Sequence, residues 1–140
     1  MENYIATTCA ALIVEEGDQF YFLQKGDTIF RLAKDEGEHA IGDVVTGFVY
    51  TDKENHSRIT TVALAATQET FGWGVVTDVR KDLGVFVDTG LPGKDVVVSL
   101  DDLPLEKEQW PKKGDQLYVK LVLDRKARIW GHLAWHRDFR

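Results

Sequence analysis

The chain has 140 residues, of which 44% are hydrophobic and 29% are charged, and its formal net charge is −6. This composition is typical of a globular protein and permits one medium domain or two small barrels. No apolar run approaches the ~20 residues of a membrane span, and the N-terminus lacks the basic start of a secretory signal. Cys9 is the only cysteine, which excludes an internal disulfide. We therefore expect a cytoplasmic protein that makes no contact with membranes.

The acidic charge is unevenly distributed along the chain. Residues 1–66 contain five Lys or Arg against eleven Asp or Glu, whereas residues 67–140 contain twelve of each kind. A net acidic protein does not bind polyanions indiscriminately. Any attraction to phosphate groups should therefore come mainly from the C-terminal half.

Alternating hydrophobic residues predict five strands in the first half of the chain. Three of them cover residues 8–14, 19–24 and 28–32, with turns rich in Gly, Asp and Glu between them. Residues 34–40 then favour a short helical turn. The Gly-Asp pair at 42–43 leads into a fourth strand, and a fifth begins at Arg58–Ile59.

The second half repeats this pattern, with strands predicted over 75–79, 85–88 and 96–100 and short helical turns within 101–110. The pair Gly114–Asp115 lies 72 residues after the first Gly-Asp pair, as Asp124 does after Asp52. Arg128–Ile129 lies only 70 residues after Arg58–Ile59, which predicts a hairpin loop two residues longer in the first copy.

This count predicts an all-β protein built from two tandem five-stranded barrels of the OB-fold group, over residues 1–67 and 68–140. The structural alternative is a single ten-stranded sandwich, which the internal repeat makes the less favoured arrangement.

The alternation in the second unit indicates which side chains are exposed. Val85 and Val87 share one face, and Phe86 shares the other with Asp88. Because an unpaired carboxylate is rarely buried, the valine face should be the core and Phe86 should point outward. By the same reasoning Tyr118, Lys120, Arg128, Trp130 and His132 face outward. Trp73 and Trp110 are expected to be packing residues.

Aromatic side chains interleaved with cations are what single-stranded RNA binding requires, because stacking contributes roughly 1–3 kcal/mol per base and Lys or Arg contacts the phosphates. The alternative for such aromatics is ordinary packing in or around a small barrel. We expect Phe86 and Trp130 to stack on bases. The expected contacts to phosphate or sugar are Arg128, Lys120, Lys94 and Arg125, and Tyr118 and His132 complete the candidate RNA-binding set.

The pattern Gly74-x-Val76-x-x-Val79, Gly84-x-Phe86-Val87-Asp88-x-Gly90 and Gly114-Asp115 resembles the S1 RNA-binding motif. With the DLGVFVDTGLPGKD and WPKKGDQLY stretches, the chain resembles the conserved virulence factor B family, bacterial proteins with several S1-like domains and a C-terminal winged helix. The resemblance implies an RNA-binding regulator of gene expression, of which this chain corresponds to the first two S1-like domains, with further C-terminal domains missing. It departs from S1 domains at Leu83 and Val97, where an aromatic and a histidine are common.

Catalysis and metal binding are not expected. His132 and His136 are four residues apart, but no third ligand accompanies them, and the acidic residues of 101–108 are typical of a solvated loop. No Gly-rich phosphate loop or nucleophile–base set is present in the sequence, so we expect no cofactor.

A protein-interaction scaffold is the alternative function. In that hypothesis the acidic first unit, through Phe48 and Tyr50, docks a ribosomal or transcription component. A third possibility is that domains beyond this chain hold the main RNA surface and this piece modulates it.

Overall fold

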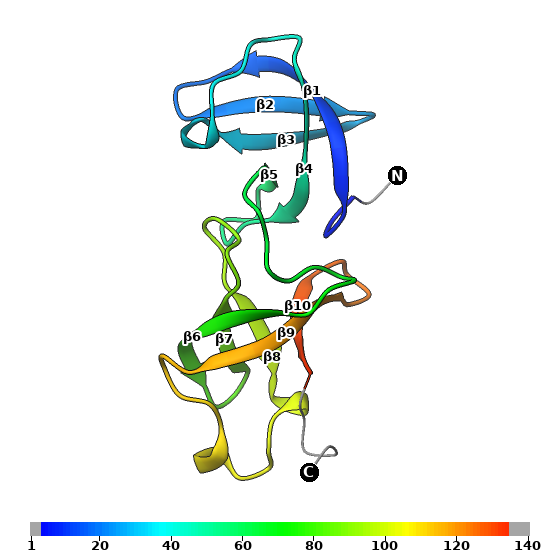
Figure 1. Ribbon diagram of the computed structural model, residues 1–140. Helices are drawn as coiled ribbons and strands as arrows, with labels where there is room; N and C mark the ends of the chain where they lie inside the picture. Colours follow the sequence, from blue (N-terminus) through cyan, green and yellow to red (C-terminus); the bar gives the residue numbers. More distant parts are fainter. Residues whose placement is uncertain (1–3, 135–140) are drawn as a thin grey trace. The chain divides into compact units, whose positions relative to one another are not determined.

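The computed structural model describes residues 4–134, which form β-strands and short 3-10 turns (Figure 1). The chain divides into two compact units, Met1–Val62 and Ala63–Arg140. Five strands close into a barrel in each unit, which confirms the predicted fold and shows that the single sandwich is wrong. The predicted boundary between residues 67 and 68 stays a prediction. Within the described residues, no helix is both long enough and apolar enough to cross a membrane.

The strands of both barrels follow the same order. In the first barrel the neighbours are β1-β2-β3-β5-β4, with β4 closing on β1 and with a parallel β3–β5 pair. In the second they are β10-β8-β7-β6-β9, with a parallel β10–β8 pair. The first barrel comprises β1 (Thr8–Glu16), β2 (Phe20–Lys25), β3 (Thr28–Ala33), η1 (Lys34–Glu36), β4 (Val44–Thr51) and β5 (Ser57–Thr60). The second comprises β6 (Gly72–Arg80), β7 (Gly84–Asp88), β8 (Val96–Ser99), η2 (Leu100–Asp102), η3 (Lys107–Gln109), β9 (Gln116–Leu123) and β10 (Ile129–Leu133).

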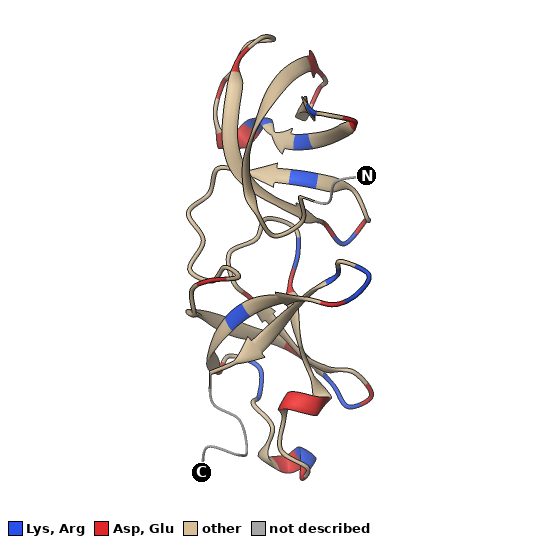
Figure 2. Cartoon of the chain, turned by 90° about the vertical axis from the view of Figure 1, so that its right-hand side faces the viewer, with Lys and Arg blue, Asp and Glu red and all other residues tan. Residues whose placement is uncertain are grey.

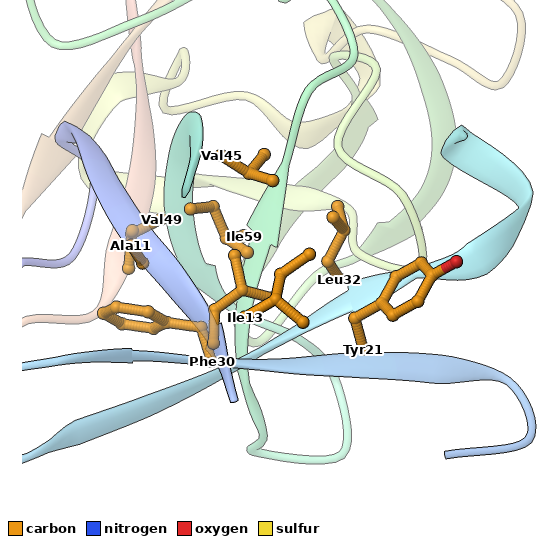
Figure 3. Packing of buried hydrophobic residues seen from close by; sticks show 9 residues of the cluster. Ala11, Ile13, Tyr21, Phe30, Leu32, Val45, Val49 and Ile59 are labelled. Atoms are coloured by element: carbon orange, nitrogen blue, oxygen red, sulfur yellow. The ribbon is translucent and has the colours of Figure 1, made fainter. Parts of the chain in front are cut away.

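Each barrel is filled by the inward residues of its alternating strands. In the first barrel these side chains converge between the strands, as Figure 3 shows for Ile13, Phe30 and Ile59. In the second barrel Val85 and Val87 are fully buried, as are the facing Val96 and Val98. The predicted valine core face is therefore confirmed.

Gly84 begins β7 at a position where only glycine fits. Its φ is +147°, and a Cβ atom there would lie 2.0 Å from the carbonyl oxygen of Val98. The close approach of two backbones explains why a glycine opens this strand.

The two hairpin loops have equal length, so the prediction of a longer first loop is wrong. Ser57 pairs with Thr51 and Ile129 pairs with Leu123, leaving five residues between the paired ends in both copies. The 72-residue offset therefore continues through the hairpin. Arg58 corresponds to Trp130, and the Arg-Ile similarity misaligned the repeat because it is a chance match of residue types.

Candidate nucleic-acid interface

The second barrel presents a row of three partly exposed side chains across β7, β8 and β10. Val97 is in register with Phe86 on one side and with Trp130 on the other. All three are partly exposed, while their strand neighbours Val85 and Val98 are fully buried. The outward orientation predicted for Phe86 and Trp130 follows from this alternation, and the two rings flank Val97 on one face.

The cation over the Phe86 ring is Arg80, which the sequence analysis did not select. Its guanidinium carbon lies 5.5 Å from the ring centroid, a distance that allows a cation–π interaction. Arg80 also makes an ion pair with Asp78, with 3.8 Å between Nε and Oδ2. Arg128 makes a shorter ion pair with Asp124, with 2.7 Å between Nε and Oδ2. Arg128 remains 63% exposed at its side chain, so its charge borders the same face.

Asp124 fixes the position of Trp130. Its Oδ2 accepts a 3.0 Å hydrogen bond from the indole nitrogen, and its Oδ1 accepts from the backbone nitrogens of Lys126 and Arg128. The Arg128 N–H and the Trp130 indole N–H hold the pKa of Asp124 well below its usual range. Because the ionised carboxylate holds both groups, the indole is oriented before any ligand arrives.

Asp52 has the same role in the first barrel. It accepts hydrogen bonds from the backbone nitrogens of Glu54 and His56 and from the guanidinium of Arg58, at 3.0, 2.9 and 3.2 Å. Burial raises its pKa, but the His56 N–H, the Arg58 side chain and the Glu54 N–H together lower it further, so the net shift is downward.

A second group of aromatic side chains comprises Trp73 of β6, Tyr118 of β9 and Phe71, which directly precedes β6. The ring of Tyr118 stacks on Phe71 at 5.5 Å between centroids and contacts Trp73 at 5.0 Å. Lys120 Nζ lies 5.2 Å from the Phe71 centroid. Trp73 is 59% exposed, so its prediction as a packing residue is wrong, whereas Trp110 is buried as expected and its indole nitrogen donates to the carbonyl oxygen of Pro104. The exposure of Trp73 follows from its strand position beside the exposed Tyr118, with which it is in register.

The remaining residues predicted to contact RNA lie at the edges of the face formed by β7, β8 and β10. Arg125 is exposed in the β9–β10 hairpin, and Lys94 is partly exposed in the turn before β8. His132 is paired through Nδ1 with Asp102 at 3.1 Å and lies opposite Lys120 in the β9–β10 register. Figure 2 shows that the Lys, Arg, Asp and Glu residues of the second barrel lie mostly in loops and short turns, and that few of them lie within the strands. Their contacts with RNA stay a prediction.

The first barrel carries a corresponding row that sequence reasoning missed. Phe22, Arg31 and Arg58 are in register across β2, β3 and β5, in the positions that Phe86, Val97 and Trp130 occupy in the second barrel. The Arg31 guanidinium lies 5.8 Å from the Phe20 ring and 5.7 Å from the Phe22 ring. The signal was the alternation Phe20-Tyr21-Phe22, in which the buried Tyr21 places both phenylalanines on the outer face.

Phe48 and Tyr50 are not available for docking a protein. They are 6% and 0% exposed, and burial raises the pKa of Tyr50 to about 12. The scaffold hypothesis required Phe48 and Tyr50 to be exposed on β4, and that expectation is therefore wrong.

One group of potential metal ligands occurs in residues 4–134. The ligand atoms of Asp52, Glu54 and His56 all lie within 4.8 Å of one another. Arg58 pairs with the same Asp52 carboxylate, so a positive charge already occupies the position that a cation would need. His136, considered above as a partner of His132, lies outside the described residues.

Comparison with known proteins identifies both barrels. A family profile described as the CvfB first S1-like domain matches residues 71–132, and one described as an S1 domain matches residues 7–62. The chain is 34% identical over 87% of its length to the uncharacterized protein YitL of Bacillus subtilis. It is 35% identical over 71% of its length to conserved virulence factor B of Staphylococcus epidermidis. A crystal structure of a multidomain protein with nucleic acid binding domains from Streptococcus pneumoniae matches 97% of this chain with a TM-score of 0.92 and 59% identity.

The chain spans less than half the length of each of these proteins: 41% of YitL, 33% of the S. epidermidis protein and 48% of the S. pneumoniae chain. Its two barrels nevertheless match S1-type domains over almost the whole described region. In sequence, this chain resembles the conserved virulence factor B family of S1-domain proteins.

Proposed function

We propose that this chain binds single-stranded RNA across the outer face of β7, β8 and β10. The observation that supports it best is the row Phe86–Val97–Trp130, in which two partly exposed rings flank a small apolar residue. Arg80 and Arg128 place positive charge beside the two rings. Unpaired bases can stack on the rings while the cations contact phosphates.

The first barrel adds a second surface of the same kind. Phe20 and Phe22 are partly exposed and share the guanidinium of Arg31. A general nucleic-acid-binding role is supported independently by the S1-type matches of both barrels and by the S. pneumoniae structure, whose protein is described as having nucleic acid binding domains.

The binding should be weakly sequence-specific, and the chain should have no catalytic activity of its own. Stacking on Phe86 and Trp130 tolerates any base, because every base has a π-face. In the cell, we expect a cytoplasmic RNA-binding regulator of gene expression.

The test is the binding of a fluorescently labelled hexauridylate, measured by anisotropy for the native chain and for two variants. Phe86→Ala removes one stacking ring and should weaken binding by at least about fivefold, the factor for the lower end of base-stacking free energies. Leu105→Ala is the matched control, because Leu105 is 80% exposed and lies off the proposed face. Equal affinities of the two variants would contradict the proposal.

A further inference from the structure

The second barrel contains a cavity that the proposed RNA face does not include. It has a volume of about 290 Å³ and is bounded by Trp73, Gln116 and Tyr118 from β6 and β9. Pro104 and Pro111, from the segment that joins β8 to β9, form another part of its wall. Small-molecule cavities are typically ~300–1,000 Å³, so this one suits a single small planar group.

We infer that this cavity holds one unpaired nucleobase of the RNA strand that crosses the β7–β8–β10 face, and this inference rests on the proposed function. Trp73 is 59% and Tyr118 36% exposed, and their rings lie 5.0 Å apart at the edge of the cavity. A base can stack on exposed rings of this kind. Gln109 and Gln116 line the same cavity, and each amide offers both donors and an acceptor to a base edge.

The strand registers connect the cavity to the proposed RNA face. Trp130 is in register with Val122 of β9, and Lys120 and Tyr118 follow on the same side of that strand. Four residues of a β-strand span about 13 Å. Lys120 therefore lies between the two aromatic groups, where its ammonium can contact a phosphate of the strand that runs from a base at Trp130 to a base at Trp73.

The charges around the cavity favour a base over a free phosphate as the bound group. Lys112 and Lys113 follow the lining Pro111 and are exposed, but Asp102 also lines the cavity. Asp102 is paired with His132. A mixed set of charges does not attract anions strongly, whereas a neutral base carries no charge that Asp102 would repel.

The test follows the tryptophan indole N–H signals in NMR spectra while hexauridylate or hexaadenylate is added to the full chain. The signals of both Trp73 and Trp130 should shift. In anisotropy titrations Trp73→Ala should weaken binding by at least about fivefold. Trp73→Phe keeps a stacking ring and should retain most of the affinity, and Leu105→Ala should bind as the native chain does.

Each outcome separates the two proposals. If Phe86→Ala weakens binding while Trp73→Ala matches Leu105→Ala and the Trp73 signal stays fixed, the cavity is not a base site and only this inference is overturned. If neither RNA binds the native chain, the proposed function fails and this inference fails with it.

Discussion

Replacing Asp52 by alanine should destabilise the first barrel severely and leave the second folded. Asp52 is 6% exposed, and its carboxylate accepts two backbone hydrogen bonds and the ion pair from Arg58, which is 8% exposed. Removing one partner of a buried ion pair costs about 3–5 kcal/mol, because the other charge stays buried without compensation. The rings of Phe20 and Tyr50, 5.0 and 5.8 Å from the Arg58 guanidinium carbon, offset part of this cost, so we expect about 3 kcal/mol.

That loss is large for a domain of this size. At 0.05–0.15 kcal/mol per residue, a barrel of about 60 residues has a stability of roughly 3–9 kcal/mol. A loss of about 3 kcal/mol lowers the melting temperature of such a domain by roughly 12–24 °C. The assay is urea denaturation followed by two-dimensional NMR, which resolves the signals of residues 4–62 from those of residues 63–134.

The control variants test the cause. Asp52→Ala combined with Arg58→Met should recover part of the lost stability, because no uncompensated charge remains. Asp27→Ala, at an exposed turn position of the same barrel, should leave the denaturation midpoint unchanged. If Asp52→Ala unfolds at the same urea concentration as Asp27→Ala, the Asp52–Arg58 pair does not stabilise the barrel.

Four further outcomes follow from the same structure. Gly84→Ala should destabilise the second barrel by about 1–3 kcal/mol or more, because the backbone φ is strained for alanine and the Cβ meets the Val98 oxygen. Tryptophan fluorescence during denaturation measures this loss of stability, since all four tryptophans follow residue 62. The folded-state pKa values of Asp52 and Asp124 lie below the ordinary 3.8, so their ionised forms stabilise the barrels above pH 3.8. This stabilisation should be lost as the pH falls through the lower folded-state values, which acid titration followed by circular dichroism checks. Five phosphate contacts, by Arg80, Lys94, Lys120, Arg125 and Arg128, predict a log–log salt slope no steeper than about −3.5 for RNA binding, and a much steeper slope would mean that further cations take part. Phe22→Ala should reduce RNA affinity about fivefold if the strand reaches the first barrel, and unchanged affinity would restrict binding to the second.

The fold was predictable because its signals are local. Alternating residues, Gly-Asp turns and the valine face of β7 each specify a strand or its orientation without knowledge of distant contacts. The predicted difference in hairpin-loop length was wrong because strand register is not a local signal. Arg58 and Arg128 have the same residue type and the same neighbour, but hydrogen-bond register, which the sequence does not display, aligns Arg58 with Trp130.

The candidate site was only partly predictable, since it depends on contacts between strands. Phe86 and Trp130 were identifiable from alternation, but Arg80 reaches the Phe86 ring from β6, and Trp73 is exposed beside Tyr118 of β9. Little RNA contact was expected from the first barrel because its net charge is negative. Net charge does not reveal that Arg31 lies against two outer-face phenylalanines.

The most direct test of single-stranded RNA binding is a titration of the isotopically labelled chain with hexauridylate, recorded as backbone amide chemical shifts. Progressive, saturable shifts are expected along β7, β8 and β10, with those of Phe86, Val97 and Trp130 among the largest. Shifts that are absent, or that occur only within residues 1–66, would contradict RNA binding on this face.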